Sequence, residues 1–322
     1  MKSSRSWRGA ARSCRSCKEI VADLLTPVSA FLKIAEHADY AFLLESVEGG
    51  EHVGRYSFLG KDPFLILRAR DGKHDDRARR RRRPRASSRS SRRCARLMAD
   101  FRSPFVPDLP RFTGGAVGYL GYGAASWFEP VLGDLGAGAD GADEAGFMLF
   151  DTVLAFDHVQ HRILIIANAR ITADDDLESL YQFACAKIQF LERELERSLS
   201  HTRAGRRRRR SRSRRTTRAS ASRSRCARPR STSPPATSTR SCCRSASRRR
   251  SRADPFTVYR ALRHVNPSPY MYFIRMGGVS VVGSSPEMLV RVEGSRVETH
   301  PIAGHAAARH APTKRTCGWP RS

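Results

Sequence analysis

The chain has 322 residues, with 59 Lys and Arg against 31 Asp and Glu, a formal net charge of +28 and 8 cysteines. No apolar run approaches the roughly 20 residues that a transmembrane helix needs, and the N-terminus lacks the apolar core of a signal peptide. We therefore expect a soluble, cytoplasmic protein with no membrane partner.

Basic residues are concentrated in four tracts without any acidic residue, at residues 1–16, 77–96, 203–252 and 305–322. These tracts hold 40 of the 59 basic residues, so the rest of the chain has 19 basic and 31 acidic residues and is net acidic. The tracts bury too little apolar surface to offset chain entropy, and we expect them to be disordered. Any nucleic acid they bind would be bound non-specifically, because they have almost no aromatic residue for stacking on bases.

The cysteines follow the same division, since all but Cys185 lie in or beside the tracts. The spacing of Cys14 and Cys17 suits half of a metal site, but no second pair with a matching frame follows. We therefore predict no metal site from the cysteines. A core with almost no cysteine fits a reducing cytosol.

The first patterned part of the chain predicts a helix and three strands. A helical pattern follows Pro27 and includes residues 28–35. Strand composition follows at residues 40–46, 54–59 and 64–69, with turn signals between the runs. This part is rich in strands.

The second patterned part begins with a glycine-rich apolar strand at residues 114–122, whose spacing does not match a phosphate-binding loop. Close packing between strands is the better interpretation of its glycines. Residues 147–156 and 162–171 predict an antiparallel hairpin. Thr172 is then expected to cap a helix whose first turn contains three aspartates.

After the longest basic tract, a short helix is predicted at residues 257–264, followed by strands at 270–274, 279–282 and 288–292. The fold class is therefore α+β, with an antiparallel sheet and helices. The expected organisation is a domain at residues 17–200 interrupted by tract 77–96, an Arg/Ser-rich tract at 201–253, and the start of a second domain at 254–304. We expect a disordered basic tract at residues 1–16 and an additional tail at residues 305–322.

Six short strings carry a resemblance to a known family. They are residues 26–31 (TPVSAF), 43–46 (LLES), 54–57 (GRYS), 266–271 (NPSPYM), 283–287 (GSSPE) and 301–304 (PIAG). Together and in this order they resemble anthranilate synthase component I, a chorismate-utilising enzyme. The resemblance covers the N-terminal domain of that family and the opening of its chorismate-binding domain.

The resemblance also explains the basic tracts. When codons are chosen freely for residues 235–247, the same bases read in a shifted frame encode a string similar to the one that the family has between its domains. The bases chosen for residues 305–310, read in the same way, encode a continuation of PIAG. We therefore infer that the tracts are frame-shifted translation of an anthranilate synthase gene, and that the tail at 305–322 is out of frame.

The resemblance implies conversion of chorismate and ammonia to anthranilate and pyruvate in tryptophan biosynthesis. It implies a glutamine amidotransferase subunit, component II, as the source of ammonia, and Mg²⁺ held by acidic ligands as cofactor. Most of the family's catalytic and Mg²⁺-binding residues correspond to sequence beyond Gly304, so we identify no catalytic residue and no metal ligand, and we expect this chain alone to be inactive. Gly304 matches a chorismate-contacting position, and a turn or cap role is expected for Glu287.

The resemblance further implies a feedback site for L-tryptophan at Ser46, Pro269, Tyr270 and Met271. A hydroxyl and strand-edge backbone can hold the charged groups of an amino acid, and Pro269 and Met271 offer apolar area to an indole. Without the resemblance, Ser46 merely ends a strand and Met271 fills the core. Alternatives to the whole assignment are a related aminodeoxychorismate or isochorismate synthase, or a non-enzymatic polycationic protein that binds nucleic acid.

Overall fold

The computed structural model describes residues 13–46, 54–70, 73–76, 103, 106–129, 143–172, 175–199, 214–215, 247–248, 251 and 253–299. The chain divides into two compact units, one of residues 1–199 and 258–322 and one of residues 200–257. In the smaller unit, β10 (Arg214–Arg215) pairs antiparallel with β11 (Ser247–Arg248). All other strands in the described residues belong to the larger unit.

The larger unit is built on a seven-stranded sheet in which every neighbouring pair is antiparallel, in the order β1-β9-β8-β3-β2-β12-β13. The strands are β1 (Ser13–Val21), β9 (Arg162–Arg170), β8 (Thr152–Asp157), β3 (Tyr56–Lys61), β2 (Tyr40–Glu45), β12 (Tyr270–Met276) and β13 (Val279–Ser285). In this sheet β12, which follows the longest basic tract in the sequence, lies directly beside β2 from the start of the chain.

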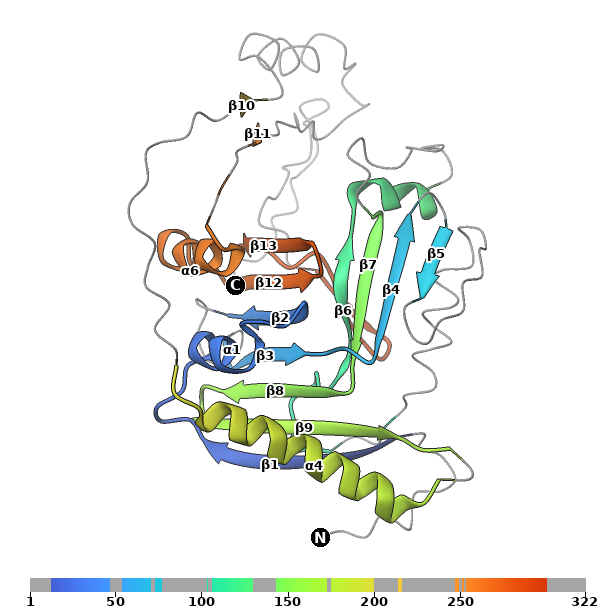
Figure 1. Ribbon diagram of the computed structural model, residues 1–322. Helices are drawn as coiled ribbons and strands as arrows, with labels where there is room; N and C mark the ends of the chain where they lie inside the picture. The colour runs from blue at the N-terminus through green and yellow to red at the C-terminus, as the bar shows by residue number, and fades with distance from the viewer. Residues whose placement is uncertain are drawn as a thin grey trace, which may run out of the picture. The chain divides into compact units, whose positions relative to one another are not determined.

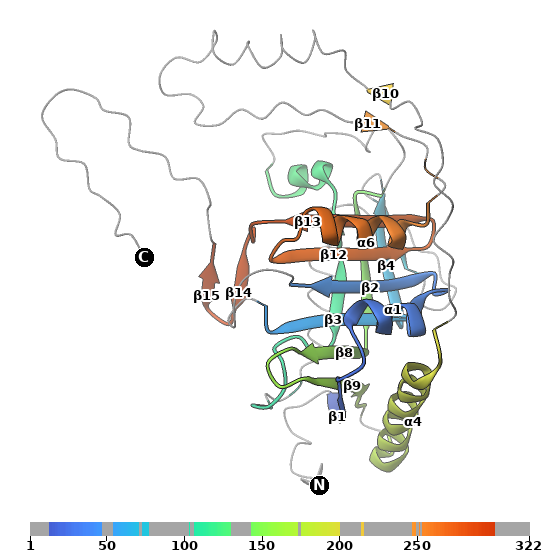
Figure 2. The same cartoon turned by 90° about the vertical axis from the view of Figure 1, so that its left-hand side faces the viewer.

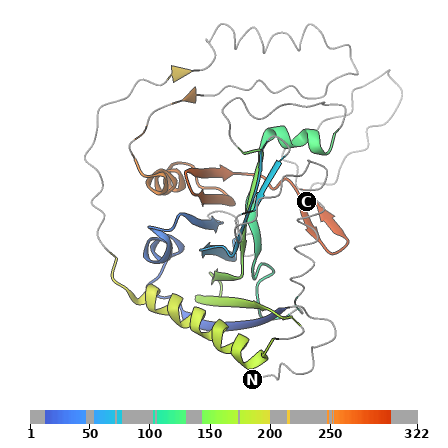
Figure 3. The same cartoon turned by 45° about the vertical axis from the view of Figure 1, so that its right-hand side comes forward.

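A second, four-stranded sheet crosses one face of the first, as Figures 1 and 3 show. Its order is β5-β4-β7-β6, with β5 (Lys73–Asp76), β4 (Leu65–Arg70), β7 (Ala145–Phe150) and β6 (Gly115–Leu120). Its strands run nearly perpendicular to those of the larger sheet, which is the orthogonal form of sheet packing. A short 3₁₀ helix, η3 (Tyr122–Trp127), follows β6, and the β14 (Arg291–Glu293) and β15 (Arg296–Glu298) strands form a separate hairpin.

Helices cover the other face of the seven-stranded sheet (Figure 2). They are α1 (Pro27–Ala35), α4 (Leu177–Glu196) and α6 (Pro255–Val265). Helix α1 packs on β2 and β3, and α4 packs on β9 and β1. The Tyr259 ring of α6 contacts the Phe273 ring of β12 at a centroid distance of 5.9 Å, and Phe273 also packs edge-on against Phe31 of α1.

The core therefore has two layers. Strand β9 contributes side chains to both of them, which explains why its sequence is almost continuously apolar. Leu164 and Ile166 face the four-stranded sheet, where they join a buried cluster with Phe42, Met148 and Phe150. Their neighbours along β9 are buried too, on the face covered by helices, so both faces of this strand exclude water. Burial of each such side chain contributes roughly 1.5–3 kcal/mol.

The α+β fold class is confirmed, and most of the predicted elements are present with small shifts of their ends. The helix after Pro27, the strand at Tyr40–Glu45, the hairpin that joins β8 to β9 and the helix before Asn266 all form. The glycine-rich stretch forms β6, as predicted. No helix in the parts of the chain that the structure describes is long and apolar enough to cross a membrane.

The prediction that residues 1–16 are disordered is wrong for the last four of them. Strand β1 begins at Ser13, and residues 13–16 pair in register with Arg170 to Ala167 of β9. A strand ladder uses backbone groups, so it tolerates this unusual side-chain composition. Ser13 is buried, and the Arg15 Nε atom donates to Asn168 Oδ1 at 3.1 Å. The tract at 201–253, also expected to be disordered, contains the short β10 and β11 strands.

Two further differences concern the middle of the chain. The predicted single strand at residues 147–156 is two strands, β7 and β8, which belong to different sheets and are separated only by Asp151. Helix α4 is capped by Asp176 rather than Thr172, because the Asp176 carboxylate accepts from the backbone N–H groups of Glu178 and Ser179. The predicted strand at 288–292 begins later, at Arg291.

Candidate functional site at the end of β2 and β12

The predicted effector residues come together at one end of the seven-stranded sheet, at the left in Figure 1. Strand β2 ends at Glu45 and is followed by Ser46, while β12 begins at Tyr270 after Pro269. The antiparallel register places Met271 directly opposite Glu45. Residues from the LLES and NPSPYM strings, which are far apart in the sequence, are therefore neighbours in the fold.

The apolar members of this group differ in burial. Met271 is 1% exposed, so its side chain fills the core here, as the alternative interpretation expected. Pro269 and Tyr270 are half-buried. Tyr270 pairs across the sheet with Ser285 of β13, which belongs to the GSSPE string, so three of the six strings meet at this edge.

Glu45, which the sequence pattern did not single out, is a buried carboxylate at the centre of the group. The Tyr259 hydroxyl of α6 donates to Glu45 Oε2 at 2.5 Å, and Arg263 Nε lies 3.3 Å from the same oxygen. Burial raises the pKa of Glu45, and the hydrogen bond from Tyr259 and the charge of Arg263 oppose that rise. Burial and the Glu45 carboxylate also raise the pKa of Tyr259, which therefore remains a donor.

A signal for this contact was present in the sequence. Glu45 belongs to the LLES string, and Tyr259 and Arg263 are four residues apart, which puts both side chains on one face of a helix. What the sequence did not indicate was that this face of α6 lies over the end of β2. That contact depends on the pairing of β2 with β12, two strands separated by more than 200 residues.

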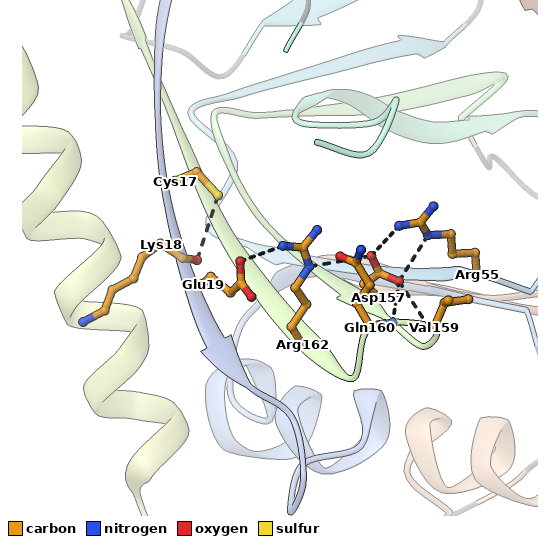
Figure 4. A network of polar contacts seen from close by, with 8 residues as sticks. All are labelled: Cys17, Lys18, Glu19, Arg55, Asp157, Val159, Gln160 and Arg162. Carbon is orange, nitrogen blue, oxygen red and sulfur yellow. Dashed lines mark hydrogen bonds and ion pairs between the residues drawn. The ribbon is translucent and has the colours of Figure 1, made fainter. Parts of the chain in front are cut away.

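A second polar network, drawn in Figure 4, lies at the same end of the sheet. It spans the strands on the other side of β2, from β3 to β1. The buried Asp157 carboxylate at the end of β8 accepts from Arg55 Nη2 at 2.9 Å and Nε at 3.2 Å, and from the backbone N–H groups of Val159 and Gln160. Arg162 lies 3.7 Å from Asp157 and donates to Glu19 of β1 at 2.6 Å. This network holds together the ends of β1, β9, β8 and β3.

The charges of this network set the pKa of Asp157. Burial alone would raise it, but the hydrogen bonds from Arg55 and from the Gln160 and Val159 amides lower the pKa below its usual value. The neighbouring His158 Nε2 is 2.8 Å from Ser57 Oγ, and burial lowers the pKa of His158. The contacts of Asp157 are all internal, so they indicate a structural clamp.

The residues described here do not fit a Mg²⁺ site. Within the described part of the chain, no three His, Cys, Asp or Glu side chains come together as metal ligands, and we derive no step through a metal. The Glu287 backbone N–H donates a weak hydrogen bond to Ser285 Oγ at 3.4 Å, and Ser285 Oγ donates to the Glu287 carbonyl at 2.8 Å, as in a turn. Gly304, the predicted chorismate contact, lies outside the described residues.

Comparison with known proteins agrees with the fold and the strings. The profile of the chorismate binding enzyme family matches residues 39–316. The chain belongs to this family. Curated relatives include anthranilate synthase component 1 from Acetivibrio thermocellus, 35% identical over 89% of this chain, and from Pseudomonas aeruginosa, 34% identical over 89% of it. A probable anthranilate synthase component 1 from Schizosaccharomyces pombe is 34% identical over 88%.

The chain spans less than two thirds of the length of these relatives, 58% of the A. thermocellus protein and 55% of the S. pombe protein. Among solved structures, anthranilate synthase component I from Streptococcus pneumoniae has a TM-score of 0.53 and 22% sequence identity, and the match covers 86% of this chain and 59% of that one. This similarity supports the two-sheet fold. The resemblance seen in the six strings is confirmed at the level of the family.

Proposed function

We propose that the protein is an anthranilate synthase component I. In that role it would act on chorismate and ammonia to form anthranilate and pyruvate, with ammonia delivered from glutamine by a glutamine amidotransferase subunit, component II. Membership of the chorismate binding enzyme family and the names of the relatives support this assignment. Aminodeoxychorismate and isochorismate synthases remain the related alternatives, and the LLES and NPSPYM strings favour the tryptophan enzyme.

The observation that carries the proposal is the β2–β12 register, which aligns the LLES string with the NPSPYM string. We propose that L-tryptophan binds at this edge, against Ser46, Pro269, Tyr270 and Met271. The Ser46 hydroxyl and the backbone at the strand ends can accept and donate hydrogen bonds to the charged groups of the amino acid. Pro269 and Tyr270 are half-buried and can cover an indole ring.

Ligand binding tests this proposal without depending on turnover. Isothermal titration calorimetry of the 322-residue chain should show saturable binding of L-tryptophan, and L-phenylalanine should bind at least about tenfold more weakly because it lacks the indole area. Replacement Ser46→Ala should weaken tryptophan binding, whereas Ser280→Ala, toward the other end of β13 and opposite Arg275, is the matched control. Equal binding of both amino acids, or none, would refute the effector site.

Turnover is measured separately, from anthranilate fluorescence with chorismate, ammonium and Mg²⁺, and by complementation of a tryptophan auxotroph that lacks component I. Formation of anthranilate supports the anthranilate synthase assignment. Formation of aminodeoxychorismate or isochorismate instead would assign the chain to a related enzyme.

We also propose that the basic tracts are frame-shifted translation of the same gene. The split between an acidic, patterned part and tracts without any acidic residue supports this. Sequencing of the DNA around codons 77–96, 203–252 and 305 onward tests it directly. If the tracts are encoded in frame and expressed, a salt-sensitive electrophoretic shift with nucleic acid would favour the polycationic alternative.

A further inference from the structure

The β14–β15 hairpin has one charged face and one apolar face. Its cross-strand pairs are two pairs of opposite charge with a valine pair between them: Arg291 with Glu298, Glu293 with Arg296, and Val292 with Val297. Successive side chains of a strand point to opposite faces, so the charged residues share one face and the two valines share the other. We call the side of the hairpin that carries Val292 and Val297 the valine face.

The charged face is satisfied within the chain. Arg296 Nη2 lies 2.6 Å from Glu298 Oε1, and Arg291 Nη1 lies 3.8 Å from the other oxygen of the same carboxylate. Glu293 forms an ion pair with Arg111, which precedes β6. With two basic and two acidic residues, the two strands are electrically neutral.

The valine face, in contrast, is exposed to solvent. Val292 is 62% exposed and Val297 is 64% exposed, and the chain enters β14 through Leu289 and Val290, which are 89% and 49% exposed. Among the described residues no other strand pairs with β14 or β15. A two-stranded hairpin is marginal in water unless its apolar face is covered, and exposed apolar side chains that gather in one place mark an interaction surface.

Two observations favour a second copy of the chain as the partner. Residues 300–322, which follow the hairpin, offer two large apolar side chains, Ile302 and Trp319, beside four basic residues and no acidic one. A second copy brings an identical valine face. Because the strands are neutral and their charges lie on the opposite face, two hairpins can approach each other without like-charge repulsion between them.

We propose that two copies of the chain bind each other through the valine faces of their β14–β15 hairpins, across a two-fold axis. The same patch serves on both copies, so Val292 and Val297 of one hairpin pack against the same two residues of the other. Two two-stranded sheets then lie face to face, as in other sheet packings. The face is small, so the dissociation constant should be in the micromolar range. This inference does not depend on the enzyme activity proposed above.

Sedimentation equilibrium of the nuclease-treated, 322-residue chain tests the proposal. Between about 1 and 200 µM the mass should rise from that of a monomer toward that of a dimer. The double replacement Val292→Thr/Val297→Thr keeps the branched shape and removes apolar area at four positions of the dimer, so it should raise the dissociation constant at least about tenfold. Val21→Thr is the matched control, because Val21 is a 72% exposed valine at the end of another strand and should leave the constant unchanged.

The salt dependence gives a second readout. Each copy has a net charge of +28, so the copies repel each other at low salt, and the dimer should become more stable as NaCl rises from about 0.1 to 0.5 M. Association of the basic tracts through bound nucleic acid has the opposite dependence and weakens with salt.

Circular dichroism verifies that each variant folds, which is expected because both valines are mostly exposed. Should the double variant fail to fold, Leu289→Ser, at a position before the strand, should likewise weaken the dimer. A chain that stays monomeric up to about 200 µM refutes the proposal. A dimer that is unaffected by the double replacement, or one that dissociates as salt rises, refutes it as well.

Discussion

Gly118 in β6 lies against the backbone of β7, so this position has no room for a side chain. A Cβ atom there would come 2.7 Å from Phe147 Cα and would collide with the Gly146 carbonyl oxygen. Because backbone atoms of a central strand cannot move aside cheaply, we expect Gly118→Ala to destabilise the protein by about 1–3 kcal/mol. The measurement is the denaturation midpoint in urea. Gly278→Ala is the control, since nothing lies within 4 Å of a Cβ at that turn.

We expect Asp157 to make the stability of the protein sensitive to acid. Its pKa is lowered in the folded state, so its contribution to stability is complete above the usual aspartate value of 3.8 and is lost as the pH falls through the lower folded value. We expect Asp157→Asn to flatten the decline of the free energy of unfolding below about pH 4. Urea titrations between pH 2 and pH 6 measure this. An unchanged slope would contradict the clamp, and Asp23→Asn, at an exposed position, should leave the slope unchanged.

At the scale of single residues, the sequence predicted the members of the candidate site only in part. Ser46, Pro269, Tyr270 and Met271 were selected by resemblance, and the register brings them to one edge. Glu45 was in the same string but was not selected, because a carboxylate in a strand gives no sign of its partners. Its hydrogen-bond donor Tyr259 and its ion-pair partner Arg263 are on α6, and only the fold shows that the helix lies over this strand.

Among the elements, α1 shows how local signals begin a helix. The Thr26 hydroxyl accepts from the Ser29 backbone N–H at 3.1 Å, the Ser29 hydroxyl accepts from the Thr26 backbone N–H, and Pro27 follows the cap. We expect Thr26→Ala to lower the free energy of unfolding by about 1 kcal/mol. Chemical denaturation measures this, with Thr257→Ala, at an exposed position within α6, as the comparison. An equal effect of both replacements would show that the cap is unimportant.

The helices and strands that were predicted best are those that residue composition alone identifies. Turn signals and apolar runs identified β2, β3, β4, β6 and β9, and the helical pattern identified α1 and α6. The error at residues 147–156 has a physical cause, since both β7 and β8 are buried and apolar and a single residue between them leaves no visible break. The β1 strand was missed because its first residues carry the composition of the basic tract, whereas its pairing depends on backbone groups.

For the whole molecule, the order of strands could not be derived from patterns along the chain. The seven-stranded sheet places strands from the two ends of the chain side by side, with β2 between β3 and β12. Periodicity identifies a strand and its buried face, but it does not identify the neighbour. Resemblance to the family implied that the strings belong to one protein, and the structure shows which of them meet.

The corner at Asp151 joins the two sheets more firmly than its length suggests. Its side chain receives a hydrogen bond from Lys187 of α4 at 2.7 Å, and its carbonyl accepts from the backbone and the side chain of Asn168 in β9. Because only one residue separates β7 from β8, a stretching force applied to either sheet is transmitted directly to the other. The two layers should consequently yield as one mechanical unit, and amide protons on β7 and β8 should exchange with solvent together.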